Sequence, residues 1–143
     1  MAEILHDFPI KVSPVRVFEA FATPAGLERW WTLRSAGTPK LGGEYTLHFG
    51  PEHDWRARVT RCIPGKEFEL ELTRATDDWV GSRVGVRLEG TRQGTQVRFS
   101  HTGWTEPSEH FRISSYCWAM YLRVLKRGLE FGEAVPYKDR LNV

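Results

Sequence analysis

The sequence predicts a single α+β domain in which a curved antiparallel sheet of about six strands wraps around a long C-terminal helix. Three patterns predict this fold class. Two short helix starts come early in the chain, segments with alternating apolar side chains fill its middle, and a long stretch with helical periodicity follows them. A chain of 143 residues can bury a substantial core, so we expect residues 1–143 to form one domain.

The first strand is predicted over residues 3–12, because apolar and polar side chains alternate there. A half-buried strand shows this period of two, since successive side chains point to opposite faces of the sheet. The face that we expect to point inward carries Ile4, His6, Phe8, Ile10 and Val12.

Two short helices are predicted next, at about residues 14–22 and 24–31. Each begins with a hydroxyl residue, Ser13 or Thr23, that is followed by proline. A hydroxyl oxygen at the start of a helix can accept a hydrogen bond from a free backbone N–H, and proline at the first helical position loses no hydrogen bond. We therefore expect both helices to be capped by their hydroxyl residues.

Residues 32–42 are predicted to form a loop, because serine, proline and glycine interrupt the pattern. Five further strands should follow, each with a period of two. Short turns such as Pro64-Gly65 separate them, which favours an antiparallel meander. The alternating inward positions are Tyr45, Leu47 and Phe49; Trp55, Ala57 and Val59; Phe68, Leu70 and Leu72; Val84, Val86 and Leu88; and Val97, Phe99 and His101.

The opposite faces of these strands carry charges of both signs. With the Pro64-Gly65 turn as pivot, Arg58 should lie opposite Glu71. Facing charges of opposite sign on neighbouring strands stabilise a sheet by about 0.2–1 kcal/mol per pair. We therefore interpret the arginine-rich face as a solvated ladder of ion pairs in preference to an anion-binding patch.

A long helix is predicted from about Pro107 to Phe131, and Gly132 is its natural end. Apolar residues recur along it at steps of three and four, so one face must pack on the sheet. Residues 133–143 are polar and are expected to form a partly mobile tail. The residues that form the predicted packing stripe of the long helix are Phe111, Ser114, Trp118, Leu122, Leu125 and Leu129.

Composition argues against several classes of protein. The net charge is +2, from 20 basic and 18 acidic residues, which is too small to favour nucleic acid as a partner. The first residues show neither a cationic start nor an apolar run, so we expect no signal peptide, and no stretch is apolar enough to span a membrane. Cys62 and Cys117 are far apart and are expected to be reduced thiols in a cytoplasmic protein.

The residue types that carry metal or nucleophilic chemistry are scattered. The five histidines and two cysteines show no CxxC, HxxxH or HExxH spacing, so we expect no metal ion and no cofactor. Ser100 and the pair Ser114-Ser115 lack the GxSxG context of a serine nucleophile, and Cys117 is expected to be an inert packed thiol. These residues leave enzymatic activity undecided and favour binding over catalysis.

Four segments carry a resemblance to a known superfamily. They are Ser13-Pro14 through Trp30-Trp31, Gly42-Gly43-Glu44-Tyr45, Trp79-Val80-Gly81-Ser82-Arg83-Val84 and His101-Thr102-Gly103-Trp104. In these segments the chain resembles the helix-grip superfamily, often abbreviated SRPBCC, which includes START lipid-transfer domains, polyketide cyclases and the birch-pollen allergen. It is most similar to single-domain bacterial relatives of the activator of the ninety-kilodalton heat-shock-protein ATPase, over about residues 4–132. The resemblance implies a helix-grip fold and no fixed catalytic set.

The resemblance also implies a hydrophobic cavity between the sheet and the long helix, which in relatives holds lipids, sterols, polyketides or other apolar molecules. His6 and His101 should point inward, and we expect at least one of them to border this cavity, where an imidazole could orient a ligand or transfer a proton. The alternatives are histidines bonded to the backbone and aromatic side chains that fill the core completely. The predicted cavity residues are His6, Trp30, Tyr45, Trp55, Phe68, Trp79, Phe99, His101, Trp118 and Leu122.

The function predicted from these observations is the binding of a small apolar or aromatic molecule, lipid- or polyketide-like, inside the fold. One alternative is a cyclase- or hydrolase-like enzyme that uses an inward histidine. The other is a module that interacts with a chaperone, which is less favoured because the activator itself has a second domain that this chain lacks. A weak homodimer is kept as an alternative to a monomer.

Overall fold

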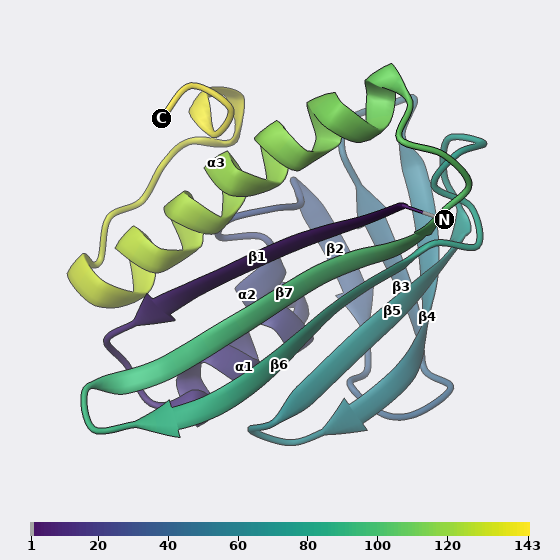
Figure 1. Ribbon diagram of the computed structural model, residues 1–143. Coiled ribbons are helices and arrows are strands. Elements are labelled where there is room, and N and C mark those ends of the chain that lie inside the picture. The colour runs from purple at the N-terminus through teal and green to yellow at the C-terminus, as the bar shows by residue number, and fades with distance from the viewer. Residues whose placement is uncertain (1) are drawn as a thin grey trace.

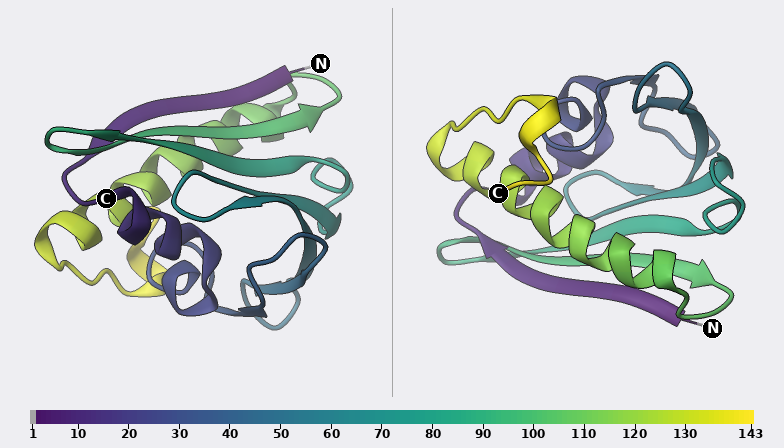
Figure 2. Two further views of the ribbon diagram at one scale, coloured as in Figure 1. Left: turned by 90° about the horizontal axis from the view of Figure 1, so that it is seen from below. Right: turned by 90° about the horizontal axis from the view of Figure 1, so that it is seen from above.

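The computed structural model describes residues 2–143, and its antiparallel sheet curves around the long helix α3 (Figure 1). The sheet has seven strands in the order β1-β7-β6-β5-β4-β3-β2. The short helices α1 and α2 lie beside α3 on the same side of the sheet (Figure 2). The elements are β1 (Ala2–Ile10), α1 (Pro14–Ala22), α2 (Pro24–Leu27), β2 (Arg34–Gly37), β3 (Glu44–His48), β4 (Asp54–Ile63), β5 (Glu67–Arg74), β6 (Arg83–Thr91), β7 (Gly94–Trp104), α3 (Glu109–Phe131) and a 3-10 turn, η1 (Tyr137–Asp139).

The predicted fold class is confirmed. Strands β3 to β7 form the expected meander, and β1 pairs antiparallel with β7, so the first strand completes the sheet beside the last. The predicted facing pair is also present: Arg58 is opposite Glu71, and its guanidinium lies 2.7 Å from the carboxylate. Charge alternation on the polar faces therefore identified the correct register.

Strand β2 lies within the segment that the sequence predicts as a loop, residues 32–42. It pairs with β3 at the edge of the sheet, and Gly37 is opposite Tyr45. A Cβ atom on Gly37 would lie 2.5 Å from the Tyr45 ring, so glycine allows the two strands to approach. The loop prediction is wrong here because a four-residue edge strand is held by its backbone and has too few apolar side chains to show a period of two.

Helix α2 is shorter than predicted and ends at Leu27 instead of residue 31. The backbone N–H groups of Trp30, Trp31 and Thr32 all donate to the Leu27 carbonyl oxygen, at 3.3, 2.9 and 3.1 Å. This tight turn buries both tryptophans, each with only 2% of its surface exposed. In a regular helix neighbouring side chains point about 100° apart, so the early end of α2 is what allows both rings to enter the core.

Only one of the two predicted helix caps is formed. The Thr23 hydroxyl accepts from the Gly26 N–H at 3.0 Å and donates to the Glu19 carbonyl at 2.8 Å, so it joins the end of α1 to the start of α2. Ser13 makes no capping hydrogen bond through its side chain. The proline that follows Ser13 still begins α1 as expected.

The caps differ enough to be compared by mutation. We expect Thr23→Ala to lower the free energy of unfolding by about 1 kcal/mol, because it removes a hydroxyl that serves two backbone groups. Ser13→Ala should change it by less than about 0.5 kcal/mol, the usual limit for a surface change that breaks no bond. Urea denaturation measures both, and equal losses would contradict the assignment of the cap to Thr23 alone.

Helix α3 begins at Glu109, two residues later than predicted, because Ser108 supplies the cap: its hydroxyl accepts from the Phe111 N–H at 3.2 Å. It ends at Phe131, and Gly132 caps it in a left-handed conformation with φ of 70°. Of the predicted stripe, Ser114, Trp118, Leu122 and Leu125 are buried.

Aromatic side chains fill the interior between the short helices and the sheet. The space left beside Phe21, Leu27, Trp30 and Phe68 is only about 10 Å³. A void of that size is barely enough for one water molecule. This part of the interior therefore has no room for a ligand, and the larger spaces lie at the edge of the core.

Candidate functional site

An open cleft of about 320 Å³ lies beside the N-terminal half of α3. Its other walls come from the turn between β3 and β4, the loop between β5 and β6, and the segment that follows α3. Small-molecule sites commonly have volumes of about 300–1,000 Å³ and mainly apolar walls. The residues that line the cleft are Trp31, Phe49, His53, Trp55, Thr76, Trp79, His110, Ile113, Ser114, Cys117, Trp118, Tyr121, Tyr137 and Leu141.

Five of these aromatic rings form a closed circuit, which we call the aromatic circuit. The centroids of Trp31 and Phe49 are 5.4 Å apart, and those of Phe49 and Trp55 are 5.1 Å apart. Trp55 and Trp79 follow at 4.9 Å, Trp79 and Trp118 at 5.9 Å, and Trp118 and Trp31 at 5.0 Å. All five separations are favourable for aromatic pairs. The circuit therefore gives the cleft a continuous and mutually supported apolar wall.

The five rings of the circuit come from four separate segments of the chain. Trp31 is held by the tight turn after α2, and Trp118 belongs to the buried stripe of α3. Phe49 and Trp55 flank the turn that joins β3 to β4. Trp79 lies in the turn before β6, where its backbone N–H donates to the Thr76 carbonyl oxygen. Curvature of the sheet around α3 is what brings these distant segments together.

A chain of buried hydrogen bonds connects two rings of the circuit. Trp118 Nε1 donates to His101 Nδ1 at 3.1 Å, and His101 Nε2 lies 2.8 Å from the Ser82 hydroxyl. That hydroxyl donates to the Trp79 carbonyl oxygen at 2.5 Å. An indole N–H can only donate, so His101 Nδ1 must accept and Nε2 must carry the proton. The imidazole thus ties α3 to the loop that holds Trp79.

His101 is a neutral imidazole whose two ring nitrogens are both hydrogen-bonded. It is completely buried on β7, and burial lowers its pKa to about 3; the nearby Asp78 raises the pKa and His110 lowers it. Both ring nitrogens already have partners, so neither is free to contact a molecule in the cleft. The structure therefore assigns His101 to positioning Trp118 and Trp79, and not to the wall of the cleft itself.

His6 lies in a different place. It faces α3 from β1, and its Nε2 is 3.2 Å from the Ser115 carbonyl oxygen, as expected for a half-buried histidine bonded to the backbone. It borders a shallow hollow of about 210 Å³ between β1 and α3, together with Phe8 and Leu122. Neither His6 nor His101 lines the aromatic cleft.

The ten residues predicted to line one cavity are divided by the structure. Trp55, Trp79 and Trp118 line the aromatic cleft. The others belong to the packed core or to other hollows because the interior is filled; for example, Trp30 Nε1 donates to the Ala20 carbonyl oxygen at 2.9 Å. The seven residues that do not line the cleft are His6, Trp30, Tyr45, Phe68, Phe99, His101 and Leu122.

Several cleft residues could not be singled out from the sequence. The alternating pattern predicts that Phe49 points inward, and Trp31 is adjacent to the predicted cavity residue Trp30. Neither pattern predicts which edge of the core is open. Tyr137 and Leu141 lie in the polar tail and carry no periodic signal. His110 lies 2.6 Å from Asp78 at the rim of the cleft. Its place there depends on how the loop before β6 folds, which no sequence pattern predicts.

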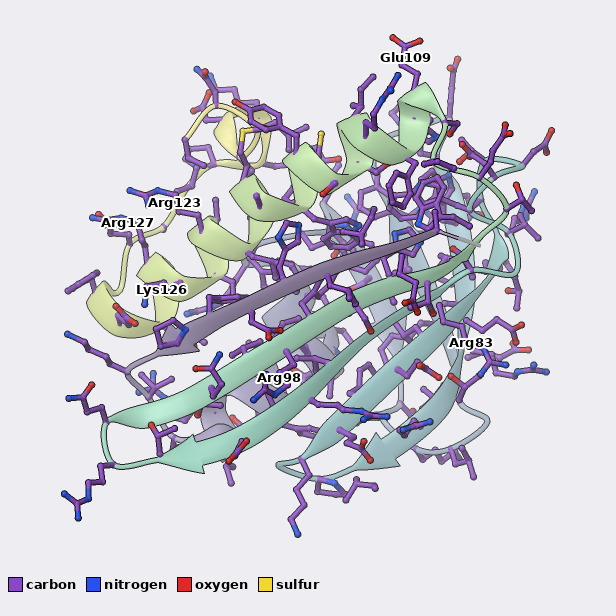
Figure 3. The ribbon with its side chains drawn as sticks, in the orientation of Figure 1. Arg83, Arg98, Glu109, Arg123, Lys126 and Arg127 are labelled. Atoms are coloured by element: carbon purple, nitrogen blue, oxygen red, sulfur yellow. The ribbon has the colours of Figure 1, made fainter. Side chains whose placement is uncertain are left out.

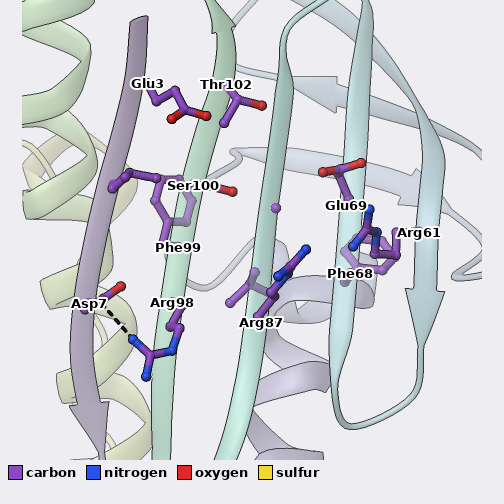
Figure 4. A pocket seen from close by; sticks show the side chains of 13 residues that line it. Glu3, Asp7, Arg61, Phe68, Glu69, Arg87, Arg98, Phe99, Ser100 and Thr102 are labelled. Carbon is purple, nitrogen blue, oxygen red and sulfur yellow. Dashed lines mark hydrogen bonds and ion pairs between the residues drawn. The ribbon is translucent and has the colours of Figure 1, made fainter.

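A larger hollow of about 710 Å³ lies on the outer face of the sheet, around Gly85 (Figure 4). Each arginine that lines it is already paired with a carboxylate. Arg98 lies 2.9 Å from Asp7, and Arg87 lies 3.1 Å from Glu67. This face is therefore the solvated ladder that the sequence predicts, and its arginines are not free to hold an anion.

Within residues 2–143, no group of three histidine, cysteine, aspartate or glutamate side chains is arranged to hold a metal ion. No helix in this range is long and apolar enough to cross a membrane. Cys62 and Cys117 are both free thiols, and burial raises the pKa of each.

The chain matches one protein family over most of its length and is similar to a solved structure. Residues 11–130 match the family described as Activator of Hsp90 ATPase homolog 1-like protein. The solution structure of the Aha1 dimer from Colwellia psychrerythraea is 30% identical, with a TM-score of 0.84 over 94% of this chain and 100% of that chain. No curated protein matches the chain.

More distant structures share the fold alone. Protein MLL2253 from Mesorhizobium loti is 17% identical, with a TM-score of 0.81 over 92% of this chain and 99% of that one. CalU16 from Micromonospora echinospora is 20% identical, with a TM-score of 0.70 over 97% and 82% of the two chains. The family match spans most of this sequence, and the Colwellia structure agrees with it over nearly the full length. The chain therefore belongs to the Activator of Hsp90 ATPase homolog 1-like family.

Proposed function

We propose that this protein binds a small apolar or aromatic molecule in the cleft walled by the aromatic circuit. The observation that carries the proposal is that five contacting rings border one open space of about 320 Å³. Burial of apolar surface is favourable by about 25 cal/mol per Å² before the costs of association. Rings held by their neighbours lose little freedom when a ligand packs on them, which favours a flat and rigid ligand.

Polar groups at the cleft can orient such a ligand. His53 and His110 stand at its edge, and Tyr121 lines it from α3. Burial raises the pKa of Tyr121 to about 12, so its hydroxyl stays protonated at neutral pH and can donate a hydrogen bond. A ligand with one carbonyl or hydroxyl group on an aromatic body fits this arrangement best.

Docking of a protein is the second candidate, because exposed apolar side chains stand beside the same cleft. Ile113 and Leu141 line it and are 51% and 45% exposed, and Tyr116 on α3 is 70% exposed. A protein partner would cover the mouth of the cleft and these side chains together. A small molecule needs only the interior of the cleft, so mutations can separate the two functions.

The binding test uses prodan, a neutral two-ring fluorophore, and titrates it while tryptophan fluorescence is recorded. We expect saturable quenching, and we expect Trp55→Ala to weaken prodan binding about tenfold, or about 1.4 kcal/mol. Trp55 is half-buried and contacts both Phe49 and Trp79, so its loss opens the circuit without removing the centre of the core.

Tyr116→Ala is the matched control, since it removes an exposed ring that lies outside the cleft. It should leave the affinity for prodan unchanged. Native mass spectrometry of freshly purified protein adds a second measurement, a co-purified small molecule. Absence of both quenching and any bound molecule would overturn the proposal, as would equal losses of affinity in the two variants.

A further inference from the structure

The chain after α3 turns back along the helix toward α1 and α2 (Figure 2). We call residues 133–143 the tail. Near its end, Arg140 is only 7% exposed. Its guanidinium donates to the carbonyl oxygens of Glu28 at 2.7 Å, Thr32 at 3.2 Å and Val135 at 3.1 Å. One side chain thus connects the tail to the segment between α2 and β2.

Arg140 is an unusual anchor because its partners are backbone groups. No carboxylate within residues 2–143 forms an ion pair with it, and burial lowers its pKa. A buried guanidinium must recover its lost hydration through well-placed acceptors, so this geometry fixes the tail firmly. Glu28 is the C-cap of α2, where free carbonyl groups attract a cation.

Two further contacts hold the tail. The Tyr137 hydroxyl donates to the Phe49 carbonyl oxygen at 3.1 Å, and the Arg140 guanidinium lies 5.6 Å from the centre of the Tyr137 ring. At the beginning of the tail, Glu133 pairs with Arg127 of α3. The tail is therefore attached to the helix, to the β3–β4 turn and to the segment after α2.

The tail also borders two spaces. Tyr137 and Leu141 line the aromatic cleft, whereas Val135 and Arg140 line a second hollow of about 320 Å³. This second hollow lies between the short helices and the C-terminal half of α3. Its walls include Ala20, Gly26, Trp30, Val124, Leu125, Gly128 and Leu129.

The family match ends at residue 130, before the tail begins. The tail residues that border the two hollows therefore lie outside the matched family segment. Changes in these residues can alter the site while leaving the packed sheet and α3 unchanged.

We propose that the tail is a specificity-determining wall, held in place by Arg140, that limits the size of the molecule accepted by the aromatic cleft. This inference rests on the proposed function. With the tail attached, a ligand has only the space beside the aromatic circuit. With the tail released, the cleft and the second hollow join along α3 and accept a longer aromatic body.

The experiment compares prodan with Nile red, a neutral probe with four fused rings. The wild-type protein should bind prodan more tightly than Nile red. Arg140→Ala should increase the affinity for Nile red at least fivefold while changing that for prodan less than threefold, so the preference should shift toward the larger probe. Arg140→Lys keeps the charge but loses the forked donor, and it should shift the preference in the same direction.

Arg123→Ala is the matched control, because Arg123 is an exposed arginine of α3 (Figure 3) that lines neither the aromatic cleft nor the second hollow. It should leave both affinities unchanged. Tyr137→Phe provides a milder variant if Arg140→Ala folds poorly: it keeps the ring and removes only the bond to Phe49, and it should shift the preference in the same direction by a smaller factor.

Hydrogen exchange of residues 135–142 reports on the tail without any ligand. Exchange there should be at least tenfold faster in Arg140→Ala than in the wild type. If exchange accelerates but the preference between the probes does not move, the tail is not a specificity wall, although prodan binding would still support the proposed function. If the wild type binds neither probe, the proposed function fails, and unchanged exchange in Arg140→Ala would overturn the anchoring role as well.

Discussion

Replacement of Trp118 by alanine is expected to lower the free energy of unfolding by about 3–5 kcal/mol, as is usual for a large aromatic residue in a core. Trp118 is 1% exposed and lies at the centre of the aromatic packing. Its ring is 4.6 Å from Phe99, 5.0 Å from Trp31 and 5.9 Å from Trp79. Domains of this size have total stabilities of about 5–15 kcal/mol, so the variant should be close to unfolding. Urea denaturation at neutral pH gives the value.

Two variants separate the causes of this loss. Trp118→Phe keeps an aromatic ring but removes the N–H that donates to His101, and a buried acceptor left without its partner costs about 1–3 kcal/mol. Tyr116→Ala, two residues earlier on the exposed face of α3, should change stability by less than about 0.5 kcal/mol. A loss below 1 kcal/mol for Trp118→Ala would show that the aromatic packing does not depend on this ring.

The sheet and the long helix could be predicted because their signals are local and repeated. Alternation in β3 to β7 and the stripe along α3 reflect the periods of two and 3.6 residues that burial on one face imposes. The pairing of Arg58 with Glu71 could be predicted for a related reason, since one turn fixes the register of two strands. Strand β2 and the end of α2 lack repeated patterns and depend on tertiary contacts.

The sequence predicts the candidate site less completely than it predicts the fold. Trp55, Trp79 and Trp118 could be proposed as inward or rim residues, but the sequence does not show whether the core leaves a space or where it opens. That depends on how well the rings of Trp30, Trp31 and Phe49 fill the interior. The position of the tail cannot be predicted from the sequence. Arg140 is held by backbone carbonyl groups, which every residue possesses, so its partners leave no pattern in the sequence.

His101 should give the protein a steep loss of stability in acid. Its folded pKa of about 3 lies well below the usual 6.5, because burial disfavours the charged imidazole. Above pH 6.5 the imidazole is neutral in both folded and unfolded chains and contributes no pH dependence. As the pH falls from 6.5 toward 3, the unfolded chain binds a proton that the folded protein excludes, so stability falls by up to about 1.4 kcal/mol per pH unit. Over that range the loss should be on the order of 4 kcal/mol.

His101→Gln isolates this contribution. A glutamine amide can still donate toward Ser82 and accept from Trp118, but it does not titrate, so its stability should depend less steeply on pH between 6.5 and 3. The neighbouring Asp78 and His110 are present in both proteins, so the difference between the two slopes reports on residue 101. Urea denaturation at half-unit steps of pH measures the two slopes, and equal slopes for the wild type and His101→Gln would mean that His101 is protonated as easily in the folded protein as in the unfolded chain.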